Sequence, residues 1–259
     1  MYLLNKFTTL SLLTSSDKVV NLFNKMNNFT NDLDLLDVKA EENLYSYFYQ
    51  SDSLKQEQVD DRIKFAYSFV NVYKDIKGLV SGELKAVEAF RKDFVGSVSD
   101  VNNESIKIFG SGFDINKVIV NGVGPAIFGE KTMINGDKIT IEAAGIGGVQ
   151  GADIFTKIIS SKKKDNEIII ENKVMFVSQY DDGSNYYVGV FKTAKKHIDN
   201  CKGASCFGLM DKISEVSNQE NTIDKMKIDN YLDKLDTYRW TFKENADGSY
   251  TFESVEKVK

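Results

Sequence analysis

The chain has 259 residues, of which 42% are apolar and 27% are charged, and its formal net charge is −5. This composition is typical of a globular protein with enough length to bury a core. The mildly acidic balance argues against a general nucleic-acid-binding role, which needs a basic surface to neutralise phosphates. No stretch reaches the roughly 20 consecutive apolar residues that a membrane-spanning helix requires.

The first residues, MYLLNKFTTLSLLTSSDK, allow two interpretations. One lysine precedes the apolar stretch Phe7–Leu13, and small residues follow it, as in a secretory signal peptide. The same stretch also suits an ordinary first helix or strand of the fold. The sequence therefore leaves the compartment open between the cytoplasm and secretion.

Apolar residues recur at helical spacing in two stretches near the start of the chain. The first stretch carries Val19, Leu22, Met26, Phe29, Leu33 and Leu36, and the second carries Val59, Ile63, Ala66, Val70, Tyr73, Val80, Leu84, Val87 and Phe94. A polar turn separates them, so we predict an antiparallel helical hairpin over residues 1–100. Its apolar stripes either cover a core or dock a partner protein.

Glycine is absent from the first 77 residues, and ten of the 18 glycines lie between Gly110 and Gly151. In this part of the chain the apolar period changes to two, at Ile106 and Ile108, Val118 and Val120, and Ile139 and Ile141. The spacing predicts short strands, with tight turns at Asn121–Gly122 and Asn135–Gly136.

The rest of the chain alternates further strands with polar segments. We predict a helix over Ala152–Ser161 that leads into the strand Glu167–Ile170. Two hairpins follow, Lys173–Tyr180 with Tyr186–Lys192 and Arg239–Lys243 with Ser249–Val255. Polar helices are expected at Leu209–Ser217 and Thr222–Leu235. The sequence thus predicts an α+β fold, in which residues 101–259 form a glycine-rich domain with a mixed, mostly antiparallel sheet.

A glycine-rich segment between Lys138 and Lys173 has the outline of a strand–loop–helix–strand unit that binds a nucleotide. Its glycines would cradle phosphates, and Glu171 stands after them as a ribose-binding acid would, although somewhat farther along the chain than expected. However, Gln150 stands where the third glycine of the fingerprint belongs, so a packing and turning region is the other interpretation. The candidate phosphate-binding residues are Gly145, Gly147, Gly148 and Gly151.

The same small residues could form a close-packing face like those of pore-forming proteins, which gives a membrane-active toxin as an alternative function. The face would consist of Ala144, Gly148 and either Gly151 or Ala152. Charged and polar residues interrupt this stretch, and it is too short to span a membrane.

The single histidine and the two cysteines lie close together, as His197, Cys201 and Cys206. In an exported protein the cysteines could form a disulfide. With Asp199 or Asp211 the three residues could instead bind a metal, although structural zinc sites usually contain a second ligand pair. One histidine excludes any site that needs several imidazoles. The sequence nominates no catalytic residue and no cofactor.

The C-terminal segment YLDKLDTYRWTFKENADGSYTFESVEKVK, Tyr231–Lys259, has aromatic residues alternating with polar ones on both sides of Asp247–Gly248. This segment resembles the closing helix and hairpin of small extracytoplasmic bacterial domains of the NTF2-like kind. The resemblance implies a curved sheet with a pocket, and often no catalytic activity. It transfers no functional residue to this chain.

The leading hypothesis is a non-enzymatic bacterial protein, either cytoplasmic or exported, that acts through protein–protein contacts or self-association of its helical region. It rests on the long apolar stripes and on the lack of a recognisable catalytic constellation. The alternatives are a nucleotide- or small-ligand-binding protein that uses residues 145–152, and a membrane-active toxin.

Overall fold

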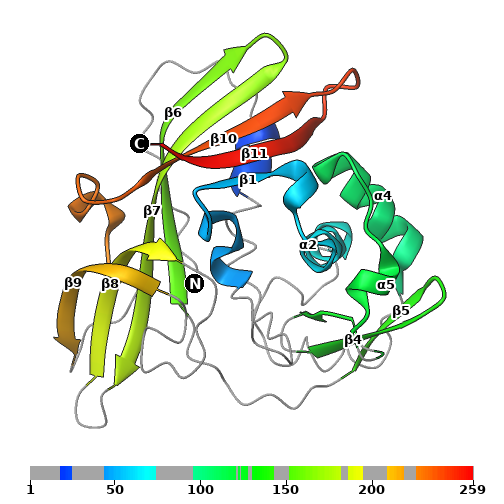
Figure 1. Cartoon of the computed structure of the whole chain (residues 1–259), viewed down its shortest axis with the longest axis horizontal. Coiled ribbons are helices and arrows are strands. Elements are labelled where there is room, and N and C mark those ends of the chain that lie inside the picture. Colours follow the sequence, from blue (N-terminus) through cyan, green and yellow to red (C-terminus); the bar gives the residue numbers. More distant parts are fainter. Residues whose placement is uncertain are drawn as a thin grey trace.

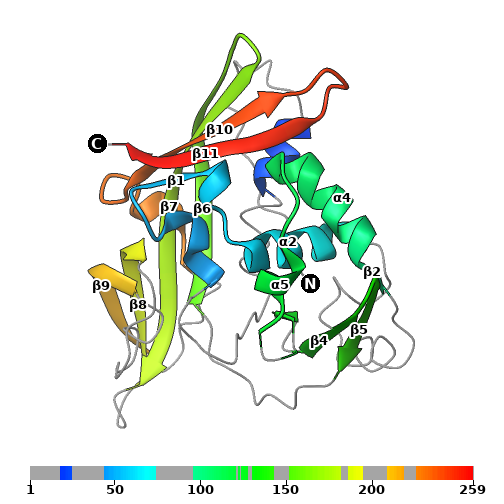
Figure 2. The ribbon, with the colours of Figure 1, turned by 45° about the vertical axis from the view of Figure 1, so that its right-hand side comes forward.

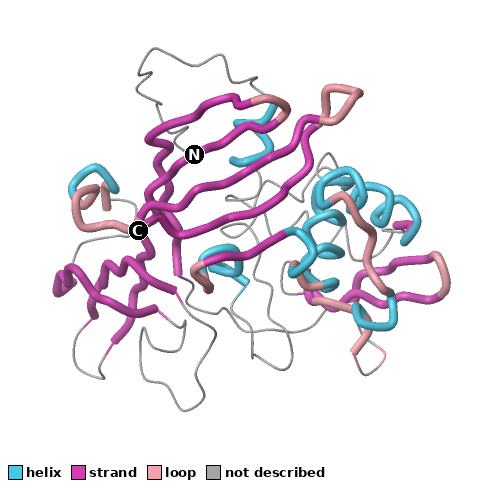
Figure 3. The backbone as a smooth tube through the Cα atoms, turned by 45° about the horizontal axis from the view of Figure 1, so that its top comes forward, coloured by secondary structure: helices cyan, strands magenta, loops and turns pink. Residues whose placement is uncertain are grey.

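The computed structural model describes residues 18–24, 44–73, 96–120, 122, 124–127, 130–142, 152–181, 186–194, 209–218 and 226–258. Their strands form two sheets, one of seven strands and one of four. Within each sheet, neighbouring strands pair antiparallel. Figure 3 shows the larger sheet on one side of the molecule, with most of the helices gathered near the smaller sheet on the other.

The predicted antiparallel helical hairpin over residues 1–100 is wrong, because the described residues form mostly sheet with few short helices. In the described chain, residues 18–24 of the first stripe and α2 (Asp61–Tyr73) of the second are helical. Between them lie η1 (Leu44–Tyr49), strand β1 (Ser53–Lys55) and η2 (Gln56–Gln58). Aromatic side chains of η1 pack on the larger sheet. The segment between the two helices therefore covers the sheet and does not fold one helix back on the other. The remainder of both stripes lies outside the described residues.

The long strand β7 (Glu167–Asp181) organises the larger sheet. One of its edges pairs along most of its length with β6 (Ala152–Lys164). The other edge is shared, because its first half pairs with β10 (Thr237–Glu244) and its second half with β8 (Tyr186–Ala194). The sheet therefore forks along β7, and Figure 2 shows this strand running from one part of the sheet to the other.

The fork gives the sheet two arms. The first arm continues from β10 to β11 (Tyr250–Val258) and β1, and the second continues from β8 to β9 (Leu209–Asn218). In Figure 1 the first arm lies at the top and the second at the lower left. The sheet curls like half of a barrel. We call the surface that faces η1 and residues 18–24 the inner face, and the opposite surface the outer face.

Two predicted hairpins and the predicted turn at Asn135–Gly136 are confirmed. Strand β7 pairs with β8 and β10 pairs with β11, where Gly248 in the turn has a φ of 73°. The turn after Asn135 joins β4 (Glu130–Asn135) to β5 (Lys138–Glu142), and Gly136 has a φ of 59°. Glycine suits both turns because it has no Cβ atom, and a Cβ atom would disfavour these positive φ angles.

Two segments that we predicted as helices are strands, and this corrects the fold class further. Residues 152–161 belong to β6, and residues 209–217 belong to β9. In β6, the β-branched residues Ile154, Thr156 and Ile158 occupy alternate positions, a pattern that favours a strand. The described part of the third predicted helix, residues 226–235, contains the single 3₁₀ turn η5 (Ile228–Asn230) and no α-helix.

The strand predicted at Ile106 and Ile108 is also wrong, because these residues lie in helix α4 (Val98–Phe109). The Ser97 side chain caps this helix by accepting a hydrogen bond from the Asp100 N–H, and Gly110 ends it with a φ of 65°. Val118, predicted as a strand residue, ends the short helix α5 (Ile115–Val118).

The smaller sheet has the strand order β2, β5, β4, β3, in which β2 is Gly96–Ser97 and β3 is Ala126–Ile127. Its β4–β5 turn is fastened to the start of α4, where Asp137 accepts hydrogen bonds from the Ser97 and Ser99 hydroxyls at 2.8 and 2.7 Å. These bonds hold the pKa of Asp137 below its ordinary value. The turn thus positions the first residues of α4.

Candidate functional site

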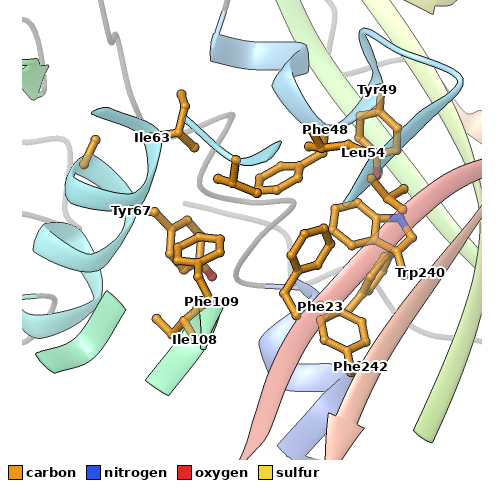
Figure 4. Packing of buried hydrophobic residues seen from close by; sticks show 14 of the residues in the cluster. Phe23, Phe48, Tyr49, Leu54, Ile63, Tyr67, Ile108, Phe109, Trp240 and Phe242 are labelled. Atoms are coloured by element: carbon orange, nitrogen blue, oxygen red, sulfur yellow. The ribbon is translucent and has the colours of Figure 1, made fainter. Parts of the chain in front are cut away.

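The inner face of the first arm is filled by the chain's own aromatic side chains (Figure 4). Trp240 on β10 is fully buried, and its ring centroid lies 5.4 Å from Phe23 and 5.3 Å from Phe48. Helices α2 and α4 extend the same apolar cluster. Aromatic rings therefore occupy the inner surface on which the resemblance to NTF2-like domains implied a pocket, and here they form a core.

A buried amide side chain, that of Asn172, lies within this core. Asn172 on β7 is fully buried, and its amide accepts a hydrogen bond from the Trp240 indole N–H at 3.1 Å. The same amide donates to the Tyr49 hydroxyl at 3.2 Å. Burial raises the pKa of Tyr49 far above its ordinary value, so this hydroxyl stays protonated near neutral pH. The group satisfies buried polar atoms and holds η1 on the sheet.

The outer face of the first arm carries a polar arrangement that is open to solvent. Arg239 on β10 donates hydrogen bonds to Glu171 on β7 through Nε at 3.0 Å and Nη2 at 2.8 Å. Its Nη1 atom donates to Glu256 on β11 at 3.1 Å, and the Ser160 hydroxyl on β6 donates to Glu171 at 3.0 Å. A polar ladder therefore crosses four strands.

The ladder fixes the charge of its members. The hydrogen bond from Arg239 is the largest influence on Glu171, and it holds the pKa of this carboxyl below its ordinary value. The same bond raises the pKa of Arg239 further. Both groups are charged throughout the physiological pH range, so the ladder is suited to binding and orienting and not to exchanging protons near neutrality.

Two elements that the nucleotide hypothesis requires, the helix and a free ribose-binding acid, are not present in the described residues. The segment expected to begin a helix at Ala152 is β6, which pairs antiparallel with β7, and Glu171 is engaged by Arg239. A strand does not offer the unpaired N–H groups with which a helix N-terminus binds phosphate. Gly145, Gly147, Gly148 and Gly151 lie outside the described residues, as does the small-residue face of the toxin hypothesis before Ala152.

The cysteine and metal hypotheses also fall on positions outside the described residues, because His197, Asp199, Cys201 and Cys206 all lie there. Asp211, the other possible fourth ligand, is on β9 and accepts a hydrogen bond from the Thr193 hydroxyl at 2.8 Å. In the described ranges, no three histidine, cysteine or acidic side chains are grouped as ligands of a metal ion would be.

Sequence reasoning missed Asn172 and the outer ladder, although each left a signal. Arg239 is a polar position of the hairpin segment whose aromatic positions, Trp240 and Phe242, identified the buried face. Residues on either side of a buried strand position point to the opposite surface. The sequence alone does not show the register of β10 with β7 and β11, which places Glu171 and Glu256 directly opposite Arg239.

No family model, curated protein or solved structure matches this chain. Of the helices in the described ranges, none is long and apolar enough to cross a membrane.

Proposed function

We propose that this chain is a binding protein and not an enzyme, and that it docks a protein partner on the outer face of the first arm. The observation that supports this most is the contrast between the two faces of β10. The inner side of the strand is filled with aromatic residues, whereas the outer side presents ordered polar groups to solvent. The proposal moves the interaction from the helical region to the sheet.

The composition of the outer face favours a protein partner. Both signs of charge alternate across the strands, and they include Arg239, whose guanidinium donates hydrogen bonds to two carboxylates. Between the charges lie Ile169 and Thr241, which are partly exposed and sit opposite each other on β7 and β10. A rigid surface of paired charges with small apolar patches suits a protein interface, in which arginine is enriched. A single-sign surface would suit nucleic acid.

The test places a photo-crosslinking residue at Ser254, which lies on β11 opposite Thr241. The control carries the same residue at Ile106, which is 46% exposed on α4, away from this face. In cells of the native host we expect position 254, but not position 106, to give one adduct of defined mass whose partner mass spectrometry identifies. Thr241→Arg, which places a bulky charge at the centre of the face, should abolish this adduct.

Each variant is first checked for the native fold by circular dichroism and by the emission of Trp240. Identical adducts from both positions, or an adduct at 254 that survives Thr241→Arg, would contradict docking on this face. A crosslinked dimer that Thr241→Arg abolishes would identify the partner as a second copy of the chain.

A further inference from the structure

The outer face of the second arm is covered by residues 226–236, which we call the strap. Four residues of β7 and β8 on this face are fully buried, namely Met175, Val177, Val188 and Val190. Leu235 of the strap belongs to the same apolar cluster. Three other strap residues, Met226, Ile228 and Tyr231, pack against this cluster. The strap therefore shields an apolar surface that is continuous with the polar outer face of the first arm.

Lysine side chains from three different strands fasten the strap. Lys157 on β6 forms an ion pair with Asp229, and Lys257 on β11 forms one with Asp236 at 2.7 Å. Lys173 on β7 donates a hydrogen bond to the Leu235 carbonyl at 2.6 Å. The Lys157 and Lys257 side chains are 38% and 30% exposed, so dissolved salt can screen both ion pairs.

The main chain of the strap is not part of either sheet. Its described backbone hydrogen bonds are local: the N–H groups of Asn230, Tyr231 and Lys234 donate to carbonyls three residues earlier. Within the described ranges, no backbone hydrogen bond joins residues 226–236 to a strand of the second arm. Lifting the strap would thus break contacts between side chains and the Lys173 bond to the Leu235 carbonyl, while β7 would keep its ladders with β6, β8 and β10.

From this attachment we infer that the strap opens as a unit while the sheet stays folded, so that the apolar outer face of the second arm is alternately covered and uncovered. Segments held by few backbone bonds open more readily than the strands beneath them. Salt shifts the balance toward the open form, because two of the three fastenings are partly exposed ion pairs. The device does not depend on the partner proposed above.

The test compares the chemical accessibility of two buried valines in the same sheet. Val188→Cys lies under the strap, and the control Val174→Cys lies in the inner core, with both native side chains fully buried. The variants are treated with iodoacetamide under native conditions. Peptide mass spectrometry follows each cysteine separately, including the native Cys201 and Cys206. We expect position 188 to react about tenfold faster than position 174 or more.

Two further results identify the lysine fastenings as the cause. Molar salt should accelerate the labelling of position 188 and leave the emission of Trp240 unchanged, since this residue reports the inner core. Lys157→Gln should accelerate the labelling further, whereas Lys162→Gln, on the same strand but not in contact with the strap, should not.

The inference is overturned if positions 188 and 174 react at the same rate, equal to the rate of global unfolding seen by Trp240 emission. It is also overturned if position 188 reacts faster but neither salt nor Lys157→Gln changes its rate. Global stability is measured in urea for each variant, and Val190→Cys repeats the comparison at a second site under the strap.

Discussion

The two faces of β7 differ in how evenly they are buried. On the inner face, Ile168, Ile170, Asn172, Val174 and Phe176 are buried without a break. On the outer face the character changes midway, from the partly exposed Glu171 and Lys173 to the fully buried Met175 and Val177. One strand thus has one continuous core face and one face that is divided between solvent and the strap.

The difference shows that alternation along a strand determines which side chains share a face of the sheet. Whether that face is buried depends on the segments that pack on it. The inner face of β7 is buried throughout because its residues belong to one apolar cluster with η1 and residues 18–24. In the described part of the chain, the buried residues of its outer face, Met175 and Val177, form one cluster with side chains of residues 226–236. Substitutions on the two faces should therefore have effects of very different size.

The largest effect is expected at the inner face. Trp240→Ala removes a fully buried ring, and we expect it to lower the free energy of unfolding by about 3–5 kcal/mol. Thr241→Ala, the next residue on the outer face, should change it by less than about 0.5 kcal/mol. Urea denaturation followed by circular dichroism measures both. Should Trp240→Ala fail to fold, Phe242→Leu makes the same comparison. Equal losses on the two faces would contradict the division.

A smaller effect is expected at the polar group inside the inner face. Asn172→Ala removes the acceptor of the buried Trp240 indole N–H, which should cost about 1–3 kcal/mol. Trp240→Phe removes the donor of the same bond. In a double-mutant cycle the two changes should therefore be less than additive. Strict additivity would show that this hydrogen bond does not couple the two residues.

The smallest effect is expected at the outer ladder, whose Arg239 and Glu171 side chains are 35% and 21% exposed. At neutral pH, Glu171→Gln should lower stability by less than about 1 kcal/mol. Because Arg239 lowers the pKa of Glu171 in the folded state, the ladder stabilises the fold above the unfolded pKa of about 4.3 and loses this contribution as the pH falls through the folded value.

The gap between wild type and Glu171→Gln should therefore close below about pH 4. Glu167→Gln, on the same strand and face, controls for loss of charge alone. A gap that widens on acidification would contradict the assigned role of the ladder.

The sequence predicted the hairpins well because their turns are determined locally. Gly136 and Gly248 hold backbone angles that favour glycine, and the alternating residues beside them belong to the paired strands. The helical region was predicted poorly because apolar spacing does not show what an element packs against. Phe48 and Tyr49 follow a helical stripe in the sequence, yet they pack on Trp240 of the sheet.

Short apolar patterns misled the prediction in both directions. Ile106 and Ile108 fit a strand by alternation, but Val101, Ser105 and Ile108 fit a helix that Ser97 begins and Gly110 ends. The capping residues carried the stronger signal.

The outer ladder could not be predicted because it needs the register of strands that are far apart in the sequence. Arg239 bonds to Glu171, 68 positions earlier, and no local pattern links the two. Asn172 was equally hidden, since a polar residue between strand residues usually indicates the solvent side. The strap was predicted as a polar helix, although its apolar residues cover a sheet face that only the fork creates.

The pairing of β1 with β11 has a consequence for the order of events during synthesis. Residues 53–55 find their strand partners at 254–256, and the carbonyls of Lys107 and Phe109 at the end of α4 accept hydrogen bonds from Thr251 and Gln56. Neither β1 nor the last turn of α4 can complete its bonds until β11 has left the ribosome. Pairing between such distant segments slows folding. The nascent chain therefore exposes its aromatic inner face for longer than a fold of the same size with local contacts would. Binding by a chaperone is most useful during that interval.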